Sequence, residues 1–182
     1  MTGTGISVEF AAAEPERLAR WWAHVLGWEL AGALAVLPRG PGLPLRFVAA
    51  DRAKTGKNRV HLDLRSESHE HQQDFLLRLF NAGARFVDIG QGEDVPWQVL
   101  ADPAGNELCL LEPRRSDVDT GPVHSVVVES ADPAAESAAY DLPAVLQRPD
   151  LVVLHSPQRT GPYLEFVPGG ATGDVVRLVP AS

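Results

Sequence analysis

Alternation of hydrophobic and polar residues predicts several strands. Ile6, Val8 and Phe10 alternate with polar residues, and residues 59–64 alternate in the same way, which is typical of half-buried strands. Further strands are expected where short apolar runs lie between turn residues: 28–30, 33–37, 44–49, 85–89, 97–101, 107–111, 123–128, 151–154, 163–167 and 175–179.

Helical periodicity follows three of these strands. After Pro15, apolar residues recur at helical spacing up to Gly27, and a second apolar stripe runs from Phe75 to Phe80. Proline in the first turn and glycine after the last are common helix boundaries. A weaker helix is expected after Asp132-Pro133. The chain therefore repeats the order strand, helix, three strands.

An internal repeat supports three copies of this unit. Ser7 and Glu14-Pro15 correspond to Ser125 and Asp132-Pro133 at one constant offset, and Leu45-Arg46-Phe47-Val48 corresponds to Leu164-Glu165-Phe166-Val167. Repeats of this length indicate one supersecondary unit used several times. We predict an α+β fold of βαβββ modules at 5–57 and 58–112, a linker at 114–121, and a degenerate third module at 122–182.

Composition and charge restrict the classes of partner that the protein is expected to bind. The 182 residues carry a net charge of −8, which argues against nucleic acid because phosphate is bound by basic surfaces. No apolar run is long enough to span a bilayer, and the N-terminus lacks the features of a signal peptide. A single cysteine, Cys109, suits a reducing compartment. We expect a cytoplasmic protein with no membrane partner.

Three phrases resemble the glyoxalase/bleomycin-resistance/dioxygenase superfamily, also called vicinal oxygen chelate proteins. They are Val25-Leu26-Gly27-Trp28, Asn58-Arg59-Val60-His61-Leu62-Asp63-Leu64 and Leu100-Ala101-Asp102-Pro103-Ala104-Gly105-Asn106-Glu107. The resemblance covers residues 5–112, so 1–113 is expected to form a glyoxalase-like domain. It implies that the first two modules lie side by side as an incomplete barrel around a cavity.

The same resemblance places the family's metal-ligand positions at Ser7, Arg46, His61 and Cys109. His61 is a usual ligand, whereas Arg46 would repel a cation. We therefore expect no cofactor, and a divalent metal is disfavoured.

The alternation itself indicates a polar cavity lined by Glu9, Arg46, His61, Asp63 and Glu107. The guanidinium of Arg46 suits a carboxylate or enolate. These charges equally suit one another as structural ion pairs, with His61 as a hydrogen-bonded wall residue.

Three other residues complete the candidate ligand-binding set. Ser7 shares a strand face with Glu9, and Cys109 shares one with Glu107, although plain core packing is the more common role for a free cysteine. Trp97 offers an aromatic surface for stacking. The hairpin can pair its strands in two ways, so the face of the sheet on which this side chain lies stays open.

Three functions fit these residues. The first is a small-molecule binding protein of the bleomycin-resistance type. The second is a metal-independent or weakly metal-dependent lyase or isomerase for a small carboxylate or carbonyl compound, with His61 as base, Glu9 or Glu107 as proton partner, and Arg46 stabilising an enolate. The third is a scaffold in which the third module packs within the chain or forms a homodimer.

Overall fold

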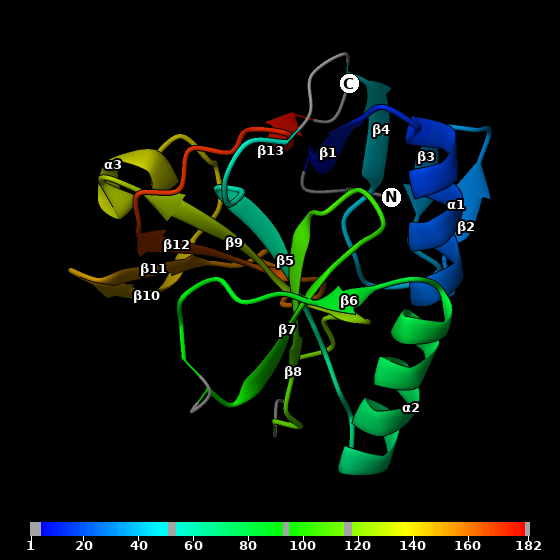
Figure 1. The fold of residues 1–182 in the computed structure, drawn as a ribbon. Coiled ribbons are helices and arrows are strands. Elements are labelled where there is room, and N and C mark those ends of the chain that lie inside the picture. Colours follow the sequence, from blue (N-terminus) through cyan, green and yellow to red (C-terminus); the bar gives the residue numbers. More distant parts are fainter. Residues whose placement is uncertain (1–4, 51–53, 93–94, 115–117, 181–182) are drawn as a thin grey trace.

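Two open sheets organise the chain (Figure 1). The computed structural model describes residues 5–50, 54–92, 95–114 and 118–180. The predicted linker at 114–121 includes residues 115–117, which lie outside the described residues. Along the chain, one order of elements occurs three times and a further strand follows.

The first unit contains β1 (Ile6–Ala12), α1 (Pro15–Leu26), β2 (Glu29–Ala31), β3 (Ala35–Leu37) and β4 (Leu45–Ala49). The second contains β5 (Val60–Leu64), α2 (His69–Asn81), β6 (Arg85–Phe86), β7 (Trp97–Ala101) and β8 (Glu107–Leu111). The third contains β9 (Val123–Ser130), α3 (Pro133–Ser137), β10 (Ala144–Arg148), β11 (Leu151–Leu154) and β12 (Tyr163–Pro168), and β13 (Val176–Pro180) follows.

The predicted α+β class is confirmed, and the three units are divided between the two sheets. The second and third units form one eight-stranded sheet in the order β10-β11-β12-β9-β5-β8-β7-β6. The first unit forms a five-stranded sheet with β13, in the order β13-β1-β4-β3-β2. Among the described strands, the first two units therefore share no sheet, and their arrangement side by side around one cavity stays a prediction.

The junction of the eight-stranded sheet lies between β5 and β9. These strands run antiparallel and pair His61 with Val127 and Asp63 with Ser125. On their outer sides β5 pairs in parallel with β8, and β9 pairs in parallel with β12. The third unit therefore packs within the chain, one of the two arrangements expected for it, whereas a homodimer stays a prediction.

Helix α1 packs its apolar stripe on the five-stranded sheet. Pro15 occupies its first turn, and Gly27 ends it in the left-handed region at φ 66°, which glycine adopts without steric cost. The Phe10 ring lies 5.2 Å from both Trp22 and Phe47. In Figure 1, α1 and α2 lie on one side of the molecule and α3 on the other.

The hairpin between β7 and β8 is held by a buried carboxylate. Oδ1 of Asp102 accepts hydrogen bonds from the backbone nitrogens of Ala104 and Asn106, each at 2.9 Å. The side chain of Asn106 donates to Oδ2 of Asp102, and that of Asn58 donates to Oδ1 of Asn106. This network fixes the hairpin and the entry to β5.

None of the helices described here combines the length and the hydrophobicity that crossing a membrane requires.

Candidate functional site

Strand β5 presents opposite chemistry on its two faces. Val60, Leu62 and Leu64 are buried in the hydrophobic core, so the intervening His61 and Asp63 project from the other face. We call this face of the eight-stranded sheet the polar face.

Register places two rows of side chains across the polar face. One row runs from Cys109 on β8 through Asp63 on β5 and Ser125 on β9 to Tyr163 on β12. The adjacent row contains His61, Val127 and Glu165, followed by Val153 on β11. Directly opposed residues share a face, so groups from both units meet at this junction.

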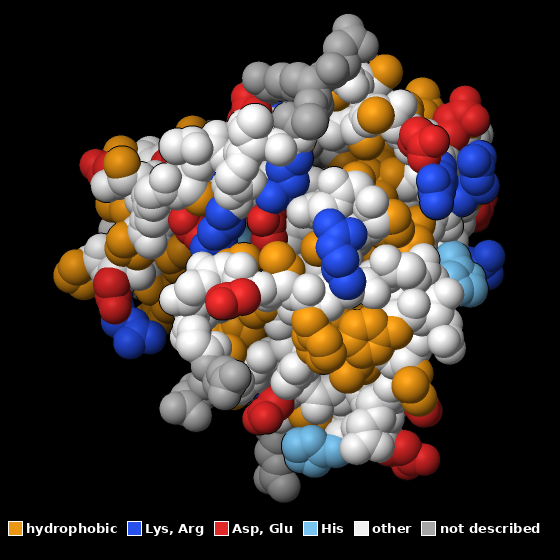
Figure 2. Space-filling model, viewed as in Figure 1, with side chains coloured by type: hydrophobic (Ala, Val, Ile, Leu, Met, Phe, Trp, Pro, Cys, Tyr) orange, Lys and Arg blue, Asp and Glu red, His pale blue; other side chains and the backbone are white. Residues whose placement is uncertain are grey.

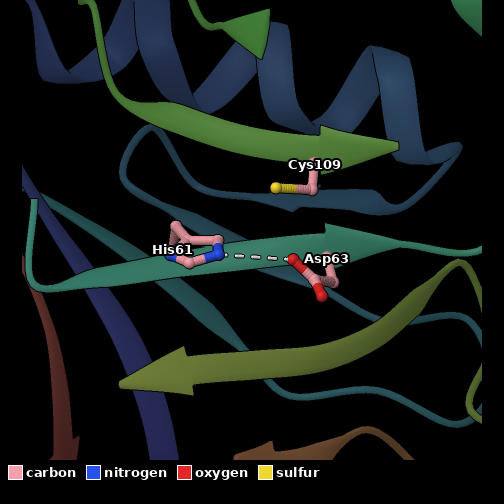
Figure 3. A group of neighbouring side chains, drawn as sticks. All are labelled: His61, Asp63 and Cys109. Atoms are coloured by element: carbon pink, nitrogen blue, oxygen red, sulfur yellow. Dashed lines mark ion pairs between the residues drawn. The ribbon is translucent and has the colours of Figure 1, made fainter. Parts of the chain in front are cut away.

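His61, Asp63 and Cys109 form the centre of the polar face (Figure 3). One ligand atom from each lies within 4.8 Å of the others. Nε2 of His61 lies 3.4 Å from Oδ1 of Asp63, and the two side chains are only 10% and 14% exposed. The Ser125 hydroxyl donates to the other oxygen of Asp63 at 3.5 Å.

Within the part of the chain that the structure describes, two polar atoms of this centre are buried without a hydrogen bond: Nδ1 of His61 and Oδ1 of Asp63. The approach of His61 to Asp63 is therefore an electrostatic contact and not a formed hydrogen bond. An unsatisfied buried polar atom costs about 1–3 kcal/mol. Such a cost is typical of a site that completes its contacts with a bound group.

Glu165 is an ionisable group beside the centre that was not predicted from the sequence. Burial raises the pKa of its carboxyl, and the charge of Asp63 raises it further, while a hydrogen bond with Ser125 lowers it. Burial also raises the pKa of the Cys109 thiol, again with a contribution from Asp63. The signal for Glu165 was present in the repeat, which aligns it with Arg46.

The donor set fits a divalent metal. His61, Asp63 and Cys109 offer one imidazole, one carboxylate and one thiol, which are groups that bind zinc-like ions in proteins, and Glu165 adds a second carboxylate nearby. Burial is the first cause of the raised pKa values of Glu165 and Cys109, and the charge of Asp63 is the second. A cation here would favour the charged forms of both groups. Arg46, which the resemblance grouped with His61 as a ligand position, lies on the five-stranded sheet, whereas His61 lies on the eight-stranded sheet.

The first unit's candidate residues lie on a different sheet from His61. Glu9 on β1 pairs with Arg46 on β4, and Arg177 of β13 donates to Glu9 at 2.8 Å. Ser7 is buried on β1, and its hydroxyl has no hydrogen-bond partner among the described residues. Ser7, Glu9 and Arg46 therefore belong to the five-stranded sheet, whereas His61, Asp63 and Cys109 belong to the eight-stranded sheet.

Glu107 lies on β8 near the centre, but other groups hold it. Its Oε1 accepts a hydrogen bond from Nζ of Lys54 at 2.6 Å, and its Oε2 accepts one from the backbone nitrogen of Asn58 at 3.2 Å. Its side chain is only 6% exposed. These contacts tie the carboxylate to the segment that precedes β5.

Trp97 lines a cavity beside the centre. Its register partner is Leu111, and its indole nitrogen donates to Gln91 at 3.0 Å. The cavity has a volume of about 450 Å³, and Val99 is part of its wall. Because Val99 lies directly opposite Cys109, this cavity adjoins the polar centre.

Two histidines extend the polar face around Tyr163. The ring of His155 lies 4.4 Å from the Tyr163 ring, and that of His124 lies 5.4 Å away. Nε2 of His155 is 2.9 Å from the carbonyl oxygen of Gly161. Burial lowers the pKa of His124, which favours its neutral form.

Comparison with solved structures identifies proteins that have a similar fold. Glyoxalase I from Zea mays, as the V278E mutant, superposes with a TM-score of 0.61 at 13% identity, covering 94% of this chain and 70% of that one. A candidate dioxygenase from Bacillus subtilis superposes with a TM-score of 0.60 at 16% identity, covering 93% of this chain and 66% of that one. This chain thus spans about two thirds of their length, and the likeness shows the fold.

Sequence comparison identifies the family. A search of curated proteins gave no match. The sequence profile of the glyoxalase-like domain matches residues 7–111, which is more than half of the chain. The chain therefore belongs to the glyoxalase-like domain family.

Proposed function

We propose that the protein binds a small organic molecule on the polar face of the eight-stranded sheet, in the manner of the bleomycin-resistance type. The observation that supports this proposal is the centre at His61 and Asp63, in which one buried nitrogen and one buried oxygen have no hydrogen-bond partner among the described residues. A ligand or an ion that contacts these atoms removes their desolvation cost.

The cavity of Trp97 supplies a wall of mixed character. Besides Trp97 and Val99, its apolar members include Phe86, Val87 and Ile89, and Asp88, Gln91 and Gln98 are its polar members. Ligand sites commonly combine such apolar walls with a few polar groups that fix orientation. The expected ligand therefore has a flat or branched apolar body and a carbonyl or carboxylate group directed toward His61.

The centre also has the composition to hold a divalent ion, with His61, Asp63, Cys109 and Glu165 as its ligands. When bound, such an ion would act as a Lewis acid toward a carbonyl oxygen. The protein's own residues orient this chemistry, because Ser125 donates to Asp63 and the low exposure of His61 and Asp63 limits access of water.

Zinc binding tests the centre directly. Equilibrium dialysis of the purified protein against Zn²⁺, followed by elemental analysis, is expected to retain close to one ion per chain. His61→Ala and Glu165→Gln are expected to reduce retention at least about tenfold, because each removes a ligand. His69→Ala is the matched control, since His69 is exposed at the start of α2.

Ligand binding is tested separately by thermal shift with a panel of aromatic acids and carbonyl compounds. A ligand of the polar face raises the melting temperature, and Val99→Arg is expected to abolish that rise by filling the cavity. If no compound stabilises the protein with or without zinc, small-molecule binding is refuted.

A second function, lyase or isomerase activity, is favoured by the closeness of His61 to Asp63. Nε2 of His61 and Oδ1 of Asp63 are 3.4 Å apart, so the carboxylate is positioned to orient a histidine that removes a proton beside a carbonyl group. The proton partner first assigned to Glu9 or Glu107 is better assigned to Glu165, because Glu9 lies on the other sheet and Lys54 holds Glu107. Full turnover by His61→Ala would rule this function out.

A further inference from the structure

A second cleft lies beside α1, away from the polar centre. Its volume is about 620 Å³, and its lining comes from the start of α1, the ends of β1 and α2, and the hairpin of Asp102. It shares no residue with the cavity of Trp97 or with the centre at His61. In Figure 2, hydrophobic side chains occupy a hollow beside the charged side chains of α1.

The floor of this cleft is apolar. Leu18, Trp21 and Val175 contribute to it, and small side chains such as Ala11 and Ala82 leave the space open. The indole nitrogen of Trp21 donates to the carbonyl oxygen of Ala82 at 2.9 Å, so the ring offers the cleft mainly its carbon atoms. Such a floor accepts a hydrocarbon chain or an aromatic ring.

The lining contains three cations, each with a carboxylate partner. Arg17, Arg20 and Lys54 contribute three positive charges, and Glu14 contributes one negative charge. Arg17 donates to Glu14 at 2.8 Å, Arg20 lies 3.8 Å from Glu16, and Lys54 donates to Glu107. A guanidinium has five donors, so each arginine can hold a carboxylate partner and still bind an anion.

Each cation of the lining has a carboxylate partner, namely Glu14, Glu16 or Glu107, so the attraction of an anion rests on the guanidinium donors and not on a local excess of charge. One carboxylate does not use all five donors of a guanidinium. The arginines are therefore suited to a further anionic group, and the floor is suited to an apolar body.

We propose that the cleft beside α1 binds an amphipathic organic anion, a small carboxylate or sulfonate with an apolar chain or ring. The apolar part lies on Leu18 and Trp21, and the anionic group is held by Arg17 and Arg20. This binding is independent of the function proposed for the polar face.

Fluorescence titration with 1-anilinonaphthalene-8-sulfonate tests the site, with octanoate as competitor. Arg17→Glu/Arg20→Glu is expected to weaken binding of the dye at least about tenfold, because it replaces two attractive charges with two repulsive ones. Arg39→Glu/Arg148→Glu is the matched control, since it makes the same change in net charge at two exposed positions outside the cleft. Far-ultraviolet circular dichroism and melting temperature establish that both variants are folded.

Two further measurements complete the test. One distinguishes the contribution of charge from that of hydrophobicity, and the other distinguishes this cleft from the polar face. Octanoate is expected to displace the dye at least about tenfold better than octan-1-ol, which lacks the anion, and His61→Ala is expected to bind the dye as tightly as the unaltered protein. Equal weakening in the two arginine variants, equal competition by octan-1-ol, absence of dye binding, or its loss in His61→Ala would each overturn the proposal. Failure of zinc binding at His61 leaves these outcomes unchanged.

Discussion

The indole nitrogen of Trp22 donates a hydrogen bond to Oδ2 of Asp102 at 3.2 Å, across 80 residues of sequence. Trp22 belongs to the helix that covers the five-stranded sheet, and Asp102 begins the hairpin of the eight-stranded sheet. A single buried carboxylate thus joins the packing of one sheet to the turn geometry of the other.

Removal of this carboxylate is expected to destabilise the protein strongly. Asp102→Ala leaves Trp22 and the backbone nitrogens of Ala104 and Asn106 without their acceptor, so we expect the free energy of unfolding to fall by about 3–5 kcal/mol. Urea denaturation measures the change. Asp150→Ala, in an exposed turn, is the control and should stay within about 0.5 kcal/mol of the unaltered protein.

Ionisation of Asp102 makes stability depend on pH. Burial raises the pKa of its carboxyl from 3.8 to about 6, against the opposing effect of its hydrogen bonds. The folded state therefore binds this proton more tightly than the unfolded state. The resulting stabilisation is complete below about pH 4 and is lost as the pH rises through about 6, by up to about 3 kcal/mol.

Asp102→Asn isolates that effect, because the amide does not titrate. The free energy of unfolding of the unaltered protein, minus that of Asp102→Asn, should fall between about pH 4 and 6 and level off above it. Chemical denaturation at a series of pH values gives this difference. A difference that rises with pH over this window contradicts the assignment.

Gly121 connects the third unit to the first through a close backbone contact. Its φ is +67°, and a Cβ atom there would overlap the carbonyl oxygen of Pro41. Gly121→Ala is therefore expected to lower the free energy of unfolding by about 2 kcal/mol or more.

Gly40→Ala is the matched control for this substitution. A Cβ atom at Gly40 meets nothing within 4 Å, so its unfolding midpoint in guanidinium chloride should barely move. Comparable losses in the two variants would show that the close approach to Pro41 is not what requires glycine.

The pairing of β5 with β9 predicts coupling between two core residues. Leu62 and Val126 are directly opposed across this junction, and both are buried. Leu62→Ala should cost about 2–5 kcal/mol, and the cost of Leu62→Ala/Val126→Ala should differ from the sum of the two single changes by about 0.5 kcal/mol or more. Strict additivity in a double-mutant cycle would argue against this contact.

Much of the fold was predictable because local patterns decide it. The bounds of β7 and β8 match the expected strands at 97–101 and 107–111, since a turn sequence separates two apolar runs. β10 was missed because all five of its residues are exposed, and a strand with no buried side produces no alternation signal.

The site was predicted in part, for a physical reason. Period-two alternation places His61 and Asp63 on one face, and this holds whatever strand lies beside β5. Which strand that is depends on contacts between residues far apart in sequence, and the alternation contains no information on them. Arg46 was therefore set against His61, while Glu165, at the equivalent position of the third unit, went unrecognised.

The division of the polar centre between two repeats has a consequence for how its chemistry can diverge. His61, Asp63 and Cys109 belong to one repeat, whereas Glu165 and the Ser125 that donates to Asp63 belong to the next. A substitution in one copy therefore leaves the groups of the other copy in register. Exchanging β9 to β12 for the corresponding segment of another such protein would thus retune selectivity without rebuilding the helix-covered side of the molecule.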